Sequence, residues 1–245
     1  MKIALISDIH ANLVALEAVL ADIQQQEVNE IICLGDVATI GPQPLEVVRK
    51  LQEMNCICIK GNHDAALLDP KAAPEYRIAP PLISSLYWCR QKLSDTESSF
   101  LDSFKNTHSI TLPDGSDLLC FHGSPRSTTD VILPTTSPGD CEQLLGNTHM
   151  AYLAGGHTHI QMLRPFGEGL MINPGSVGCA FPRFYEAGEV PVLKPKAEYA
   201  IGSFENGDLR TDMRQISFDI PTLKQSVKAS DIPLKDWWLS QYADS

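Results

Sequence analysis

The chain has 245 residues with 43% hydrophobic content, 19 basic and 30 acidic side chains, and a net charge of −11 at pH 7. The apolar content is enough for a large core, and the acidic balance disfavours a protein whose main role is to bind nucleic acid or an anionic membrane. No apolar run approaches the roughly 20 residues that span a bilayer, and the first residues, MKIALISDIH, lack a signal-peptide cleavage pattern. We therefore expect a soluble, cytoplasmic protein without a membrane partner.

The first quarter of the chain alternates between strand-like and helix-like patterns. Apolar runs predict three strands, at 2–8, 30–36 and 56–62. Helical spacing predicts two helices between them, at 12–26 and 44–54. Asn12 has the side chain of an N-cap, and Pro44 suits the first turn of its helix. This β-α-β-α-β order predicts parallel strands with right-handed crossovers.

The middle and end of the chain have a different pattern. Residues 65–112 are expected to be a mostly helical insert, with a capping box formed by Ser94 and Glu97. Short strands are then predicted at 117–123, 151–156, 169–175, 197–204 and 208–218, the last two joined by a hairpin turn at Asn206-Gly207. The Pro-, Gly- and Ser-rich runs 127–140 and 181–196 are expected to be loops.

The overall pattern favours one domain. No internal repeat or interdomain linker is visible, so residues 1–245 are expected to fold as a single unit. The tail 221–245 carries Trp237 and Trp238, which favours a helix packed on this domain over an oligomer contact. The seven cysteines, an odd number in apolar surroundings, are expected to be buried, reduced thiols.

Each early strand ends in a group that can bind a metal ion. Asp8 and His10 follow the first predicted strand, Asp36 follows the second, and Asn62 and His63 follow the third. In an open α/β sheet the ligand crevice lies beyond the carboxyl ends of the strands, so these five groups are expected to meet there. One such acid could be a helix cap, but three strand ends in succession favour a metal site.

Later strands add imidazoles to this set. His122 comes directly after an apolar strand, and His157 and His159 occupy alternate positions in AGGHTHIQ. If this segment is a strand, alternation places both rings on one face. The candidate ligands are Asp8, His10, Asp36, Asn62, His122, His157 and His159. Oxygen and imidazole donors without thiolate suit manganese, iron or zinc, and seven donors fit two ions about 3.5–4 Å apart that share a carboxylate.

The motifs DIH, GD, GNHD, FHG and GHTH, in this order, resemble the calcineurin-like metallophosphoesterase superfamily. The segment NPGSVG at 173–178 is similar to its small prokaryotic and archaeal phosphodiesterase branch. The resemblance implies an α/β fold, a four-layer αββα sandwich of two mixed β-sheets flanked by helices. It also implies a phosphodiesterase or phosphatase that needs two divalent ions, for which manganese is favoured and iron, zinc and nickel are alternatives.

The resemblance further implies a role for each candidate residue. Asp8, His10 and His159 would hold one ion, Asn62, His122 and His157 would hold the other, and Asp36 would bridge them. His63 would be the catalytic histidine, which protonates the leaving oxygen or stabilises charge on the phosphoryl group. Two cations lower the pKa of a water held between them, and the resulting hydroxide attacks phosphorus in line with the leaving group.

The sequence departs from one part of the superfamily. Protein serine/threonine phosphatases carry G-D-x-x-D-R-G at the second motif, where this chain has GDVATIG, with Thr39 in place of the acid and Ile40 in place of the arginine. Both differences weaken the case for a protein phosphatase. Asp64 either orients His63 or caps the next helix, and Arg183 is either a phosphate contact or a surface arginine.

The expected substrate is a small phosphate ester or a nucleotide-like molecule. One rival hypothesis is a non-catalytic interaction module on the same fold, against which a complete ligand set and an intact His63 argue. Another is a nuclease, which the acidic charge and the lack of a separate basic domain disfavour. The sequence does not determine the natural substrate, the metal or the oligomeric state.

Overall fold

The computed structural model describes residues 1–146, 150–186, 188–205 and 208–242. The helices of the described residues are α1 (Leu13–Gln24), α2 (Pro44–Glu53), α3 (Asn62–Leu68), α4 (Ile83–Lys92), α5 (Asp95–Asp102), α6 (Pro138–Leu145), α7 (Ile220–Ala229) and α8 (Lys235–Gln241). Two short 3₁₀ turns, η1 (Pro70–Ala72) and η2 (Pro80–Leu82), lie between α3 and α4.

Two five-stranded sheets form the centre of the molecule. The strands of the first, in spatial order, are β10 (Asp208–Ile216), β9 (Ala197–Glu205), β1 (Lys2–Ile6), β2 (Glu30–Cys33) and β3 (Ile57–Cys58). Those of the second are β4 (His108–Thr111), β5 (Asp117–Cys120), β6 (Tyr152–Ala154), β8 (Gly169–Pro174) and β7 (Gln161–Phe166).

Both sheets mix parallel and antiparallel pairs. The predicted β-α-β-α-β unit is confirmed, because β1 pairs in parallel with β2, and β2 with β3. Asn12 caps α1 as predicted, its side chain accepting a hydrogen bond from the backbone N–H of Ala15 at 3.1 Å. The predicted hairpin strands pair antiparallel, with Glu205 opposite Asp208. The turn residues between them, Asn206 and Gly207, lie outside the described residues.

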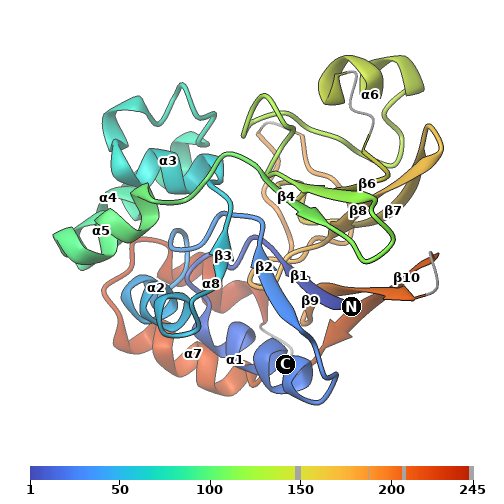
Figure 1. Cartoon of the computed structure of the whole chain (residues 1–245). Helices are drawn as coiled ribbons and strands as arrows, with labels where there is room; N and C mark the ends of the chain where they lie inside the picture. The colour runs from blue at the N-terminus through green and yellow to red at the C-terminus, as the bar shows by residue number, and fades with distance from the viewer. Residues whose placement is uncertain (147–149, 187, 206–207, 243–245) are drawn as a thin grey trace.

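The molecule has four layers, with helices on the outer face of each of the two packed sheets, and three apolar clusters fill the spaces between the layers (Figure 1). Alternate residues of β1 point to opposite faces: Ile3 and Leu5 meet the second sheet, whereas Ala4 and Ile6 meet the helices. Helices α1, α2, α7 and α8 cover the outer face of the first sheet, and α6 lies over the outer face of the second. The αββα sandwich expected from the resemblance is therefore confirmed.

The segment expected to be a helical insert is helical only in its first part. Helices α3, α4 and α5 lie together at one side of the molecule (Figure 1). The capping box at the start of α5 is present, with the Ser94 backbone N–H donating to Glu97 at 3.0 Å. Beyond α5 the expectation was wrong, because residues 108–111 form strand β4, which pairs antiparallel with β5.

The C-terminal helices pack on the main core. Trp238 of α8 is buried, and its indole N–H donates to the backbone carbonyl of Ile40 at 2.9 Å. This contact holds the loop that follows β2. All seven cysteines are free, as predicted, and six of them are buried. In the described part of the chain, no helix has both the length and the apolar character needed to cross a membrane.

Candidate metal centre

The turns after β1 and β2 lie side by side at the carboxyl edge of the first sheet. The backbone N–H of Asp8 donates to Gly35 at 2.9 Å, and that of His10 donates to Asp36 at 3.0 Å. These turns are tight, since Asp8, His10 and Asp36 all have positive φ, between 47° and 58°. Left-handed backbone is unfavourable for residues with a Cβ, and such residues cluster at functional sites.

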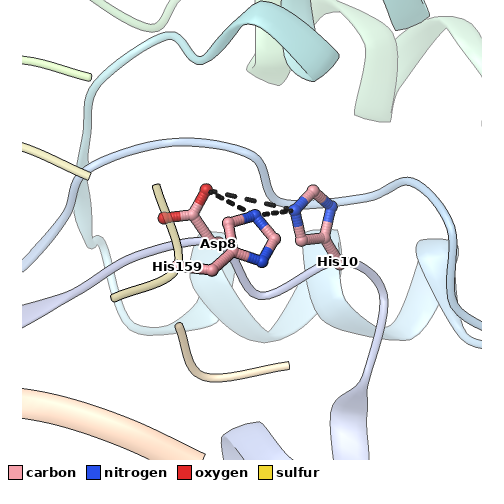
Figure 2. Close-up of side chains that lie close together, drawn as sticks. All are labelled: Asp8, His10 and His159. Carbon is pink, nitrogen blue, oxygen red and sulfur yellow. Dashed lines mark hydrogen bonds and ion pairs between the residues drawn. The ribbon is translucent and has the colours of Figure 1, made fainter. Parts of the chain in front are cut away.

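The first group of donors is Asp8, His10 and His159, which converge on one point (Figure 2). Nε2 of His159 lies 3.4 Å from Oδ1 of Asp8 and 3.0 Å from Nε2 of His10. All three side chains are buried. Oδ1 of Asp8 has no hydrogen-bond partner among the described residues, although it is buried. A buried carboxylate oxygen without a donor, facing two imidazole nitrogens, is the arrangement that a divalent cation satisfies.

The second group is Asp36, His122 and His157, whose candidate ligand atoms lie within 4.8 Å of one another. Oδ2 of Asp36 is 3.4 Å from Nε2 of His122 and 4.0 Å from Nε2 of His10, so this carboxylate faces both groups. Oδ1 of Asn62 lies 3.1 Å from the same Nε2 of His122. Asn62 therefore adds a neutral oxygen to the second group.

Backbone carbonyls orient two of the imidazoles. Nδ1 of His122 lies 2.7 Å from the carbonyl of Leu34, and Nδ1 of His159 lies 2.7 Å from that of Cys179. A carbonyl accepts hydrogen bonds only, so both rings carry a proton on Nδ1. Such contacts leave Nε2 facing the site and are typical of metal-binding histidines.

The buried carboxylates and imidazoles of the site shift one another's pKa values. Burial raises the pKa of Asp8, but the neighbouring imidazoles of His159 and His122 together outweigh burial and lower it to about 2. Burial lowers the pKa of His122, yet the carboxylates of Asp36 and Asp8 and the carbonyl of Leu34 together outweigh burial and raise it to about 10. Burial and then His122 lower the pKa of His157 to about 3. A cation bound here would take the place of the ring protons that now compensate the two carboxylates.

His157 and His159 belong to a loop and not to a strand. Strand β6 ends at Ala154 and β7 begins at Gln161, and both histidines have positive φ. The expectation that strand alternation turns them to one face was therefore wrong. The loop conformation instead directs the two rings to different groups, His159 to the first and His157 to the second.

Sequence reasoning missed the side chains that support this loop. Asn173 donates to the carbonyl of Gly156 at 2.7 Å and to the hydroxyl of Thr158 at 3.0 Å. Ser176 donates to the carbonyl of Asp8 at 2.7 Å. Both residues lie in the segment NPGSVG, in which a polar side chain precedes each of the two glycines, and this was the available signal.

His63 lies beside both groups. Its backbone N–H donates to Oδ1 of Asp36 at 2.9 Å, and its ring meets that of His10 edge-on, with 5.0 Å between centroids. Nδ1 of His63 lies 3.0 Å from the hydroxyl of Thr39. Thr39, which stands where the protein serine/threonine phosphatases carry an acid, thus contacts His63, the candidate catalytic histidine.

Asp64 and Arg183 have structural partners. The Asp64 carboxylate accepts hydrogen bonds from the backbone N–H groups of Gly61, Asp36 and Val37, at 2.8–2.9 Å, and so joins the turn after β2 to the start of α3. No hydrogen bond of the described structure joins it to His63. Arg183 is exposed and paired with Glu189, with 2.6 Å between Nη2 and Oε1.

A polar cavity of about 300 Å³ is lined by neighbours of the second group of donors, although none of the donors themselves lines it. Its walls include Tyr76, whose carbonyl accepts a hydrogen bond from Asn62 at 3.0 Å, and Ser124, which follows His122 by two residues. Arg126 also lines this cavity and is exposed.

Comparison with known proteins identifies the family. A family model described as the calcineurin-like phosphoesterase superfamily domain matches residues 1–196. The chain belongs to the calcineurin-like phosphoesterase superfamily. The five motifs of the candidate site all lie within this match, so the resemblance drawn from them is confirmed.

Similar proteins come from archaea and bacteria. The protein MJ0912 of Methanocaldococcus jannaschii is 25% identical over 236 residues, which cover 94% of this chain and 93% of that protein. A metallophosphoesterase from Sphaerobacter thermophilus is 26% identical, with a TM-score of 0.74 over 99% of each chain. PH1004 of Pyrococcus horikoshii shares the fold, with 19% identity and a TM-score of 0.77 over 95% of this chain and 94% of that one.

Proposed function

We propose that this chain is a two-metal phosphoesterase that hydrolyses phosphodiesters or small phosphate monoesters. The observation that carries the proposal is the pair of buried donor groups that share the carboxylate of Asp36. Membership of the superfamily supports it, because the family model is a phosphoesterase domain.

Each donor group is assigned to one divalent ion. Asp8, His10 and His159 would hold the first, Asn62, His122 and His157 would hold the second, and Asp36 would serve both. When bound, the two ions supply positive charge to the phosphoryl oxygens and activate the attacking water. The oxygen and imidazole donors, without thiolate, suit manganese, iron or zinc, and of these we favour manganese.

Asn62 and His63 are adjacent at the start of α3, and we assign them different roles, Asn62 as a metal ligand and His63 as a contact of the substrate. The amide of Asn62 donates to the carbonyl of Tyr76, which turns Oδ1 toward His122. A neutral oxygen at this position leaves more of the cationic charge for the substrate than a third carboxylate would. His63 is not assigned to a metal; we place it as the group that donates a hydrogen bond to the leaving oxygen or to the phosphoryl group.

The surroundings of the site favour a small substrate. The cavity lined by Tyr76 and Ser124 has room for a compact part of an ester, and its hydroxyls and the guanidinium of Arg126, with Glu75 also on the wall, suit a polar or nucleotide-like one. The net charge of −11 disfavours a long nucleic acid as the natural substrate.

The experiment is hydrolysis of bis-p-nitrophenyl phosphate and p-nitrophenyl phosphate by chelator-treated protein with Mn²⁺ restored. We expect turnover only with the metal, and a loss of about 100-fold or more in His63→Ala, the size usual for an acid–base group. The faster ester identifies diester or monoester preference. Bound metal without turnover of either ester would refute the proposal and favour a non-catalytic interaction module on the same fold.

A further inference from the structure

One buried hydroxyl lies between two imidazoles of the site. Oγ1 of Thr39 is 3.2 Å from Nδ1 of His10 and 3.0 Å from Nδ1 of His63, and the residue is 1% exposed. We propose that Thr39 is a positioning residue that keeps the ring proton of His63 on Nε2. This inference rests on the proposed function and assigns the chemical form in which His63 acts.

The proton positions follow from the contacts of His10. Its Nε2 faces Asp8, Asp36 and His159, and is the nitrogen available to a metal ion. A nitrogen that binds a cation uses its lone pair, so the ring proton of His10 lies on Nδ1 and is donated to Thr39. The hydroxyl has a single proton, which it then donates to Nδ1 of His63. Because Nδ1 of His63 accepts, the proton of that ring lies on Nε2.

This tautomer gives His63 a donor where the reaction needs one. Within the described part of the chain, Nε2 of His63 has no hydrogen-bond partner, and the side chain is half-buried beside both donor groups. An N–H at this atom donates to a phosphoryl or leaving-group oxygen. The opposite tautomer would present a lone pair to the same oxygen and repel it.

The hydroxyl acts differently from the acid found here in protein serine/threonine phosphatases. A carboxylate has no proton to give, so it accepts from Nδ1 of a histidine and stabilises the charged ring. A hydroxyl that already accepts from His10 donates to Nδ1 of His63 and so selects the tautomer with its proton on Nε2. The loop holds the hydroxyl in place, because Ile40 has a positive φ of 70° and its carbonyl accepts the buried indole N–H of Trp238.

The first test reads the tautomer directly. Protein with ¹⁵N-labelled histidine, loaded with diamagnetic Zn²⁺, is studied by long-range ¹H–¹⁵N correlation, with the His63 signals identified by their loss in His63→Gln. We expect the Nε2–H form in the wild type and in Thr39→Ser, and a mixture of forms in Thr39→Val. A wild-type Nδ1–H form, or an unchanged tautomer in Thr39→Val, would overturn the proposal.

The second test reads catalysis and metal content together, with Mn²⁺ as the added metal. We expect Thr39→Val to lower kcat about tenfold with little change in KM, Thr39→Ser to retain most activity, and Thr211→Val, a control on β10, to retain all of it. The amount of bound metal is expected to stay the same in all variants. Metal loss in Thr39→Val with an unchanged His63 tautomer would assign the effect to His10 and overturn the proposal.

The two proposals fail in different ways. A wild-type protein that binds Zn²⁺ and shows the Nε2–H form, but hydrolyses neither ester, would refute the phosphoesterase function and leave the role of Thr39 in place. An active enzyme whose His63 tautomer does not respond to Thr39→Val would refute only the role of Thr39.

Discussion

At the scale of single residues, the site depends on backbone conformations that sequence patterns do not reveal. Asp8, His10, Asp36, His157 and His159 all have positive φ, and each is a candidate metal ligand. A single such residue is unfavourable by about 1–2 kcal/mol. Hydrogen bonds of the surrounding turns therefore help to stabilise these five residues in their left-handed backbone conformations.

Asp64 supplies three of these hydrogen bonds from one buried carboxylate. We predict that Asp64→Ala lowers the free energy of unfolding by about 3–5 kcal/mol, since each bond to a charged acceptor is worth about 1.5–3 kcal/mol and neighbouring bonds do not add fully. Asp64→Asn keeps one amide oxygen as acceptor and should lose about half as much. Urea unfolding measures both losses, and values within 1 kcal/mol of the wild type for both variants would contradict this role.

The sequence predicted which residues form the site, but not the backbone conformations that orient their side chains. Asp8, Asp36 and His122 follow apolar strands, and strand ends in an α/β sheet meet at one edge, so their convergence was foreseeable. The separation of His157 and His159 was not foreseeable from alternation, because it depends on positive φ values in a loop held by Asn173. The contact between Thr39 and His63 depends on how the loop after β2 packs on α8.

At the scale of elements, local patterns predicted the central strands and missed two edge strands. Strands β4 and β7 lie at opposite edges of the second sheet. Strand β7 contains Pro165, which argues against a strand in sequence but is tolerated at an edge. Strand β4 has only four residues and follows a helical stretch, so its pairing with β5 decides its conformation.

One charged cluster ties a helix to the first sheet. Asp22 of α1 accepts hydrogen bonds from Arg214 of β10, 2.8 Å from Nε, and from the hydroxyl of Tyr199 on β9. The bonds from Arg214 first, and then from Tyr199, lower the pKa of Asp22. A lowered pKa in the folded state stabilises the protein above the ordinary carboxyl pKa of about 3.9, and this stabilisation is lost as the pH falls through the lowered value.

We therefore predict a pH-dependent difference between the wild type and Asp22→Asn. The variant should unfold with about 1–2 kcal/mol less free energy above pH ~5, and the difference should shrink as the pH falls below ~4. Denaturant unfolding across this range measures it. Asp212→Asn, which removes the exposed partner of Arg214, should change stability by less than about 1 kcal/mol at every pH. A difference for Asp22→Asn that stays constant from pH 7 to pH 3 would rule out this linkage.

At the scale of the whole molecule, each donor group draws on both sheets. In the first group, Asp8 and His10 follow a strand of the first sheet, whereas His159 lies in a loop of the second. In the second group, Asp36 belongs to the first sheet, and His122 and His157 belong to the second. The site therefore exists only when both sheets are packed together, and bound metal is expected to stabilise that packing.

An equilibrium titration of chelator-treated protein with Mn²⁺, followed by the number of ions bound per chain, tests the two-metal centre itself. We expect two ions per chain, and one fewer in each of the variants His159→Ala and His157→Ala. One ion per wild-type chain, or none, would contradict a centre built from two donor groups around Asp36.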